Sequence, residues 1–115
     1  MKNSLILKPW GSERILEKNK NYVLKKLEMK KNKRCSLQYH KKKKETIFVI
    51  SGKLEITIGK TVKHLRKKIF KEGEFITISP KIIHRMKGIT NCKYLEASTT
   101  ELMDVVRLKD DFKRI

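Results

Sequence analysis

The sequence predicts a small all-β domain built as an antiparallel sandwich or barrel. Three observations predict it: a length of 115 residues, short runs of β-branched and aromatic residues, and turn-forming residues between these runs. A chain of this length buries one modest core and not two. Short strands separated by turns are typical of antiparallel sandwiches and barrels, the jelly roll among them. We therefore expect residues 1–115 to form a single domain.

Eight runs rich in β-forming residues follow one another along the chain. They read NYVLKKLEM, RCSLQYH, TIFVISG, KLEITIG, TVKHLRKKIF, EFITIS, IIHRMK and KYLEAST. Turn-forming pairs and triplets such as Ser51-Gly52 and Glu72-Gly73-Glu74 lie between them. In residues 54–58 apolar side chains alternate with Glu55 and Thr57, which is the period of a strand with one buried face.

The two ends of the chain differ from this pattern. Helical periodicity is visible only in the last stretch, TELMDVVRLKDDF. We therefore expect an extended N-terminal arm and a C-terminal segment packed on the outside of the barrel.

The formal net charge of +18 is the most prominent feature of the composition. It comes from 24 lysines and only 6 arginines, spread over the whole chain. Arginine is the side chain suited to bidentate contacts with phosphates and bases, so a nucleic-acid reader is expected to use more of it. We interpret the lysines as a solvated surface and expect no nucleic-acid partner, apart from non-specific binding to polyanions at low salt.

Targeting signals and cysteine spacing indicate the compartment. No stretch reaches the roughly 18 consecutive apolar residues of a membrane span, and the N-terminus lacks a signal-peptide cleavage pattern. Cys35 and Cys92 match no zinc or redox spacing, so we expect two free thiols. These features indicate a cytoplasmic protein with no membrane partner.

Four side chains of metal-ligating or amide type occur in two of the predicted strand regions. Gln38 and His40 are two residues apart, so they share one face of a strand. Glu45 follows a short lysine-rich connection, and His84 follows a proline-containing turn. In a barrel these four could converge on Zn, Mn, Fe or Ni and leave positions open for water or substrate.

The blocks SLQYHKKKKETIFVISGKLEITIG and GEFITISPKIIHR resemble the two metal-binding motifs of the cupin superfamily. The closer resemblance is to the type II mannose-6-phosphate isomerase cupins, which occur alone or as the C-terminal part of bifunctional mannose-1-phosphate guanylyltransferases. Four stretches carry it: KPWGSERIL, SLQYH, SPKIIHR and EASTTELMDVVRLKDDFKR. The resemblance implies a cupin jelly-roll β-barrel.

The same resemblance implies a ligand set for a divalent cation, most simply zinc. It consists of Gln38, His40, Glu45 and His84. The family often has a further histidine two positions after the first, where this chain has Lys42, and an asparagine four positions after the last, where it has Gly88. Protonated lysine cannot ligate a cation, so the site depends on Gln38 or binds metal weakly.

The resemblance further implies an aldose–ketose isomerase acting on a sugar phosphate, with mannose 6-phosphate and fructose 6-phosphate as substrate and product. Glu96 and Glu45 are the carboxylates nearest the motifs and are candidates for the general base. Arg85, expected at the mouth of the barrel, and Arg107 are candidates for stabilising the enediolate or holding the phosphate. Lys42 and Lys44 are candidates for steering the anionic substrate inward.

Other interpretations of these residues stay open. Gln38 could bond the backbone, Glu45 could form an ion pair on a turn, and both arginines could form structural salt bridges. A cupin that modifies nucleotide sugars with a histidine, a carboxylate and no metal is a second possible enzyme, and a non-catalytic sugar-binding cupin is a third candidate. Since small cupins commonly cover exposed edge strands by pairing, we expect a homodimer.

Overall fold

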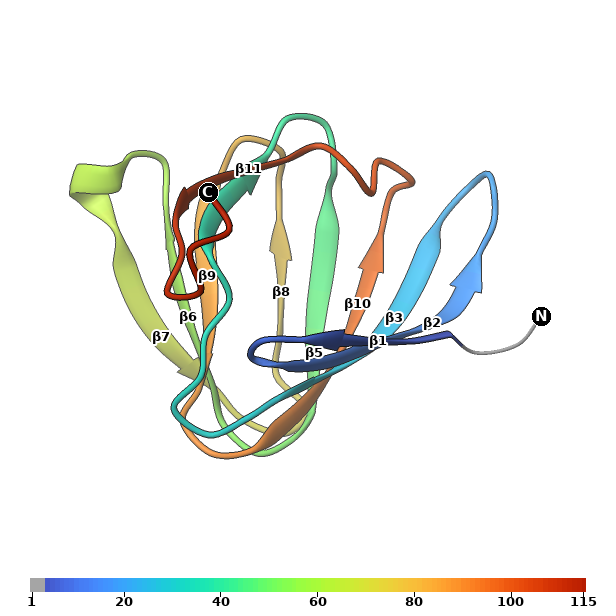
Figure 1. The fold of residues 1–115 in the computed structure, drawn as a ribbon, viewed down its shortest axis with the longest axis horizontal. Helices are drawn as coiled ribbons and strands as arrows, with labels where there is room; N and C mark the ends of the chain where they lie inside the picture. The colour runs from blue at the N-terminus through green and yellow to red at the C-terminus, as the bar shows by residue number, and fades with distance from the viewer. Residues whose placement is uncertain (1–3) are drawn as a thin grey trace.

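Two antiparallel sheets that face each other make up the protein (Figure 1). The computed structural model describes residues 4–115. The six-stranded sheet has the order β1(Ser4–Lys8), β2(Gly11–Lys18), β3(Val23–Met29), β10(Cys92–Ser98), β5(Glu45–Ser51), β8(Phe75–Ile78). The five-stranded sheet has the order β11(Val105–Lys109), β4(Leu37–His40), β9(Ile83–Gly88), β6(Leu54–Gly59), β7(Arg66–Phe70). The predicted all-β jelly-roll class is confirmed, although the two sheets do not close into one barrel.

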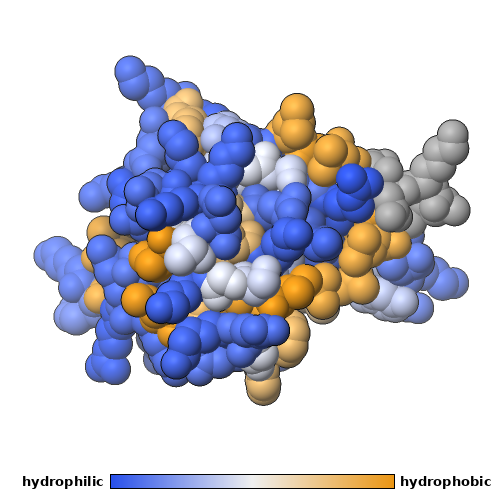
Figure 2. Space-filling view, turned by 90° about the horizontal axis from the view of Figure 1, so that it is seen from below, coloured by the Kyte–Doolittle hydropathy of each residue, from blue (hydrophilic) through white to orange (hydrophobic). Residues whose placement is uncertain are grey.

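The core lies between the two sheets because inward and outward residues alternate along each strand. Its members are the buried apolar side chains Trp10, Leu27, Met29, Ile47, Val49, Leu54, Ile56, Phe70, Ile78, Met86, Cys92 and Tyr94. The outward positions carry most of the lysines, and Figure 2 shows one face that is largely hydrophilic. Burial of one face and solvation of the other is what the alternating pattern predicts.

The turn between β5 and β6 occurs at the predicted position, Ser51-Gly52, for a structural reason. Gly52 has a φ of +80°, a conformation that favours glycine. A Cβ atom at this position would lie 2.4 Å from the carbonyl oxygen of Asn91. Position 52 therefore requires glycine, both for its backbone conformation and because the carbonyl of Asn91 approaches it closely.

Three predicted elements differ from the observed ones. The N-terminal arm is a hairpin of β1 and β2 within the six-stranded sheet. The C-terminal segment is not a separate layer on the outside, because β11 pairs antiparallel with β4 and extends the five-stranded sheet. The run TVKHLRKKIF divides into a 3-10 turn at Val62–His64 and β7. In the C-terminal segment, pairing with the distant β4 overrides weak local periodicity, whereas β1 and β7 pair with strands next to them in sequence.

No helix in residues 4–115 has the length and apolar character needed to cross a membrane. Cys35 and Cys92 are both free thiols, as the sequence predicts.

Candidate metal centre

Three ligand-type side chains meet between the two sheets. His40 ends β4 and His84 lies on the neighbouring β9, so both histidines come from the five-stranded sheet. Glu45 begins β5 in the facing sheet. One ligand atom of each residue lies within 4.8 Å of the other two, and the imidazole centroids are 5.5 Å apart. All three residues are buried, with 6%, 1% and 3% exposure respectively.

His84 directs its Nε2 atom into this cluster. Its Nδ1 lies 2.9 Å from the carbonyl oxygen of Ile82, which can only accept a hydrogen bond. In the neutral form of the ring, the proton is therefore on Nδ1 and the lone pair is on Nε2. Nε2 is 3.0 Å from Oε1 of Glu45, yet within residues 4–115 it has no aligned hydrogen-bond partner. A buried lone pair facing a carboxylate oxygen is the donor set that a divalent cation stabilises, so these residues fit a metal ion.

Asp104 orients the second histidine from a distant segment of the chain. Oδ1 of Asp104 lies 3.0 Å from Nδ1 of His40. Oδ2 accepts backbone hydrogen bonds from Lys42 at 2.7 Å and Lys43 at 3.0 Å. Burial raises the pKa of Asp104, but these donors outweigh it and hold the pKa below its usual range. An ionised Asp104 accepts the Nδ1 proton and leaves Nε2 of His40 free for a cation.

Lys43 is the one residue of the lysine run 41–44 that turns inward. Its Nζ lies 2.8 Å from Oε2 of Glu96 and 3.2 Å from Oε2 of Glu45. Lys43 is 5% exposed, whereas Lys42 and Lys44 are exposed. The buried ammonium therefore neutralises part of the negative charge that two glutamates bring into the site.

The protonation states of these groups follow from burial and from their neighbours. Burial raises the pKa of Glu96 to about 7, and the negative charge of Glu45 acts in the same direction. Burial would also raise the pKa of Glu45, but His84, when its ring is protonated on both nitrogens, and the ammonium of Lys43 outweigh burial and lower that pKa far below its usual range. Burial, assisted by the charge of Lys43, lowers the pKa of His40. At neutral pH the site therefore contains an ionised Glu45 and a neutral His40.

A cavity of about 140 Å³ adjoins the cluster. Gln38, His40, Glu45, Glu96 and Arg107 are among the residues that line it. Gln38 shares a face with His40, as predicted, and its Oε1 accepts a hydrogen bond from the Ser36 hydroxyl. Nε of Arg107 is buried without a hydrogen-bond partner in the described part of the chain, and no carboxylate of residues 4–115 pairs with this side chain. The cavity therefore holds an unpaired cation.

Arg85 lies elsewhere than at the mouth of the site. It follows His84 on β9, and adjacent residues of a strand point to opposite faces. Its guanidinium donates to the backbone carbonyls of Cys35 at 2.9 Å and Lys109 at 3.2 Å. The expectation that it faces the substrate is therefore wrong, and Arg85 instead ties two backbone segments to the outer face of the five-stranded sheet.

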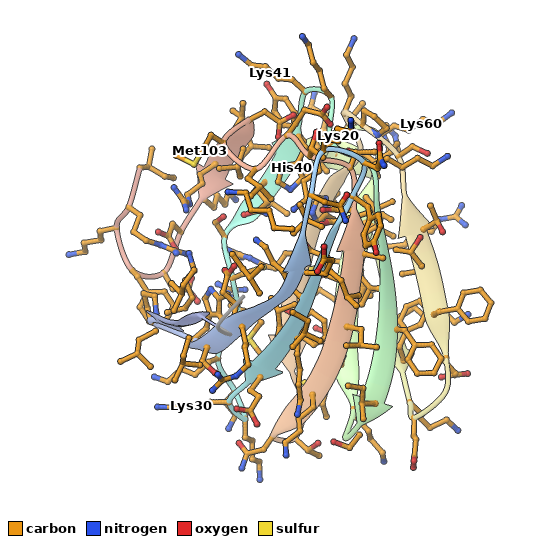
Figure 3. All side chains as sticks on the ribbon, turned by 90° about the vertical axis from the view of Figure 1, so that its right-hand side faces the viewer. Lys20, Lys30, His40, Lys41, Lys60 and Met103 are labelled. Atoms are coloured by element: carbon orange, nitrogen blue, oxygen red, sulfur yellow. The ribbon has the colours of Figure 1, made fainter. Side chains whose placement is uncertain are left out.

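The loop that carries Lys42 and Lys44 lies at one end of the molecule. Figure 3 places Lys41 at the tip of this loop and His40 below it. The amides of Lys42 and Lys44 bond Asp104 and Thr99, while both side chains are in solvent. The sequence analysis did not identify Asp104 and Lys43 as parts of the site. Asp104 lies in the last of the four stretches that carry the family resemblance, and Lys43 lies in the lysine run of the first cupin-like block.

Two facing antiparallel sheets that place two histidines and a glutamate on their inner sides define this protein as a cupin. The chain belongs to the family described as "Mannose-6-phosphate isomerase C-terminal", whose model matches residues 2–111.

Curated relatives of the chain are longer proteins. It is 26% identical over 109 residues to mannose-1-phosphate guanylyltransferase RfbM of Salmonella typhimurium, covering 90% of this chain and 22% of the relative. It is 25% identical over 114 residues to xanthan biosynthesis protein XanB of Xanthomonas campestris, covering 95% and 23%. The chain therefore spans about a fifth of the length of these relatives.

Solved structures share the fold at low sequence identity. The capsular polysaccharide assembling protein CapF of Staphylococcus aureus matches with a TM-score of 0.81 at 16% identity, covering 95% of this chain and 32% of that one. Oxalate decarboxylase of Bacillus subtilis matches with a TM-score of 0.81 at 16% identity, covering 92% and 30%. KdgF of Halomonas sp. matches with a TM-score of 0.76 at 10% identity and covers 90% of both chains.

Proposed function

We propose that this protein is a metal-dependent sugar-phosphate isomerase that interconverts mannose 6-phosphate and fructose 6-phosphate in the cytoplasm, for nucleotide-sugar or polysaccharide synthesis. The observation that carries the proposal is the buried cluster of His40, Glu45 and His84 beside a cavity that also holds Glu96 and the unpaired Arg107. The family of the chain and the relatives RfbM and XanB support this class of substrate.

His40, Glu45 and His84 would hold a divalent cation such as zinc, with Gln38 as a candidate fourth ligand. When bound, the ion supplies Lewis acidity that polarises a carbonyl and the adjacent hydroxyl of a substrate. Asp104 and the carbonyl of Ile82 fix the rings of His40 and His84, so that both Nε2 atoms are available as ligand atoms without rearrangement.

Glu96 is the better candidate for the general base, since Glu45 belongs to the ligand cluster. In the isomerisation a base takes the C2 proton of the open-chain aldose and returns a proton to C1, while a proton passes from O2 to O1. A base of this kind works best with a pKa near the working pH, and burial brings the pKa of Glu96 to about 7. Lys43 holds Glu96 in place through its 2.8 Å contact.

Arg107 is the candidate for binding the negative charge of the substrate. It lines the cavity and lacks a carboxylate partner in residues 4–115, whereas Lys43 and Arg114 are paired with acids. A guanidinium of this kind binds phosphate or an enediolate oxygen strongly. The exposed side chains of Lys42 and Lys44 would raise the local concentration of an anionic sugar near the opening.

A coupled assay for fructose 6-phosphate formation, with elemental analysis of the same preparation, tests the proposal. We expect activity that is lost with chelator and in His40→Ala, and retained in His64→Ala, because His64 is exposed and outside the cluster. Activity unchanged by chelator and by His40→Ala would remove the metal from the mechanism.

A second candidate function is a metal-independent epimerase or isomerase acting on a nucleotide sugar. The pair of His40 and Asp104 favours it, because a histidine bound to a carboxylate can serve as a base without a metal. Purified protein that contains no cation and isomerises no sugar phosphate, but converts a nucleotide sugar, would select this function. Sugar binding without any conversion would instead identify a non-catalytic cupin.

A further inference from the structure

One buried polar side chain in the cavity has no role in the chemistry proposed above. Tyr94 lies on β10, a central strand of the six-stranded sheet between β3 and β5 (Figure 1). It lines the same cavity as Glu96, which is two residues along β10 and therefore on the same face of the sheet. Tyr94 is only 2% exposed, so bulk solvent hardly reaches its ring or its hydroxyl.

The hydroxyl of Tyr94 has no hydrogen-bond partner among residues 4–115, since its polar neighbours Glu96 and Cys35 bond other groups. Within the same residues, the fully enclosed side-chain atoms that lack a partner belong to Glu45, His84 and Arg107. The oxygen of Tyr94 is not one of them, so it borders the open volume of the cavity. Buried phenols usually find a partner, so the partner of this hydroxyl is a molecule held in the cavity.

The surroundings of Tyr94 fix both the place and the protonation of its hydroxyl. Leu27 of β3 and Val49 of β5 flank Tyr94 in the sheet, and both are buried. Close packing on two sides holds the ring in one position. Burial raises the pKa of Tyr94 well above its usual range, and the negative charge of Glu96 acts in the same direction. The phenol therefore stays protonated at neutral pH and presents a hydrogen-bond donor at a fixed point.

The cavity wall is apolar next to this donor. Leu27, the cross-strand neighbour of Tyr94, lines the cavity, and Trp10 and Met86 line it as well. A ligand that offers no acceptor to the hydroxyl would leave it without a hydrogen bond in these surroundings. Such a loss costs free energy, because neither the apolar wall nor bulk water replaces the missing bond. The hydroxyl can therefore distinguish a ligand with an oxygen at this point from one with a hydrogen.

We propose that Tyr94 determines specificity by donating a hydrogen bond to one hydroxyl oxygen of the bound sugar. The class of ligand, a sugar phosphate, rests on the proposed function. Two residues of a strand span about 7 Å, so Tyr94 contacts another part of the ligand than Glu96 does. Glu96 faces the reacting carbons C1 and C2, and Tyr94 meets an oxygen on C3, C4 or C5. A sugar that lacks this oxygen leaves the phenol unpaired, so Tyr94 selects against deoxy sugars.

Calorimetric titration of wild type and Tyr94→Phe with mannose 6-phosphate and its 3-, 4- and 5-deoxy analogues tests the proposal. Tyr94→Phe is expected to weaken binding of mannose 6-phosphate by about ten-fold, the effect of one lost hydrogen bond. In wild type, one of the three analogues is expected to show a loss of the same size. Tyr94→Phe should bind that analogue as tightly as mannose 6-phosphate, because the oxygen and the hydroxyl are partners in a single bond.

A matched variant and a matched ligand control this experiment. Tyr39 lies between Gln38 and His40 on β4, so it points away from the cavity. Tyr39→Phe is therefore expected to bind every ligand as wild type does. The 2-deoxy analogue lacks an oxygen at a reacting carbon, so its loss of affinity should be the same in wild type and in Tyr94→Phe.

Thermal melting separates this role from a structural one. Because the hydroxyl bonds no group of residues 4–115, Tyr94→Phe is expected to melt at the Tm of wild type or above it. A clearly lower Tm would mean that the hydroxyl supports the fold, and this result overturns the proposal. Equal affinity of wild type and Tyr94→Phe for mannose 6-phosphate also overturns it, as do deoxy effects that are the same in both proteins.

Formation of fructose 6-phosphate distinguishes failure of this inference from failure of the proposed function. If wild type converts mannose 6-phosphate and Tyr94→Phe keeps the specificity of wild type, only the role of Tyr94 is overturned. If binding depends on Tyr94 as expected and no conversion occurs, the role of Tyr94 is supported and only the isomerase is overturned. Wild type that binds none of these sugars overturns both.

Discussion

Oδ1 of Asp104 lies 3.0 Å from Nδ1 of His40, although 64 residues separate them in the chain. The contact joins the segment before β11 to the end of β4, and the same carboxylate accepts hydrogen bonds from the amides of Lys42 and Lys43. One side chain thus fixes both a ligand of the candidate metal centre and the loop that carries Lys43.

The first prediction concerns this contact. Asp104→Asn is expected to weaken metal binding by about ten-fold or more, because a neutral amide holds the Nδ1 proton less strongly and leaves His40 a poorer ligand. Titration with Co²⁺, followed by its visible absorption, measures the effect. Asp111→Asn is the matched control, since Asp111 pairs with Arg34 outside the site. Equal affinities of wild type and Asp104→Asn would contradict the assignment.

A second prediction concerns the buried Lys43, for which two opposite effects are expected. Lys43→Met removes a positive charge beside Glu45, so a divalent cation should bind more tightly. The same change leaves two buried glutamates without their partner, so the metal-free protein should lose about 3–5 kcal/mol of stability. Competition with a chelating dye measures the affinity, and urea unfolding measures the stability.

Lys42→Met is the control for this pair of effects, because the side chain of Lys42 is in solvent. Lys42→Met should leave both the metal affinity and the free energy of unfolding nearly unchanged. A weaker metal affinity in Lys43→Met would mean that Lys43 supports the site in some way other than through its charge.

The third prediction is a pH dependence that arises from Glu96. Burial raises the pKa of this carboxyl to about 7 in the folded protein, from an ordinary value of 4.5. Between these values the folded protein holds a proton that the unfolded chain has released, so the free energy of unfolding falls as the pH rises. The slope is at most about 1.4 kcal/mol per pH unit. Urea unfolding of metal-free protein from pH 4.5 to 8 measures it, and Glu96→Gln should remove this contribution.

The fourth prediction concerns the different roles of Arg107 and Arg85. Arg107→Met is expected to weaken binding of mannose 6-phosphate by about ten-fold or more, since a charge-assisted hydrogen bond contributes about 1.5–3 kcal/mol. Arg85→Met is expected to leave binding unchanged and to lower stability by about 1–3 kcal/mol, because the carbonyls of Cys35 and Lys109 lose their donor. Calorimetric binding and thermal melting of both variants measure these effects. If Arg85→Met weakened binding of mannose 6-phosphate and Arg107→Met left it unchanged, Arg107 would be excluded as the anion-binding residue.

Several features of the fold and site could be predicted because they depend on local pattern. The runs that became β3 to β10 alternate or are rich in β-branched residues, and turns such as Ser51-Gly52 divide them. The shared face of Gln38 and His40 follows from the two-residue period of a strand. β11 was expected in another form, because its pairing with the distant β4 is not encoded in local periodicity. β1 and β2 were expected as an extended arm, although they pair with each other across the short turn at residues 9–10.

The same period could have placed Arg85 correctly, because a residue directly after an inward-facing histidine points outward. The choice among the four lysines 41–44 could not be made in this way. They lie in a loop, where no period applies, and only the glutamates of β5 and β10 select Lys43.

The sequence by itself determined the all-β class, the position of most strands along the chain and the side chains that could bind a metal. Only the tertiary structure decided that His40, Glu45 and His84 meet, that Asp104 and Lys43 join them, and that Arg107 rather than Arg85 lines the cavity. The physical reason is the range of the interactions. Alternation along a strand acts between neighbours, whereas the site forms from strands of two sheets that are brought together by burial of a common core.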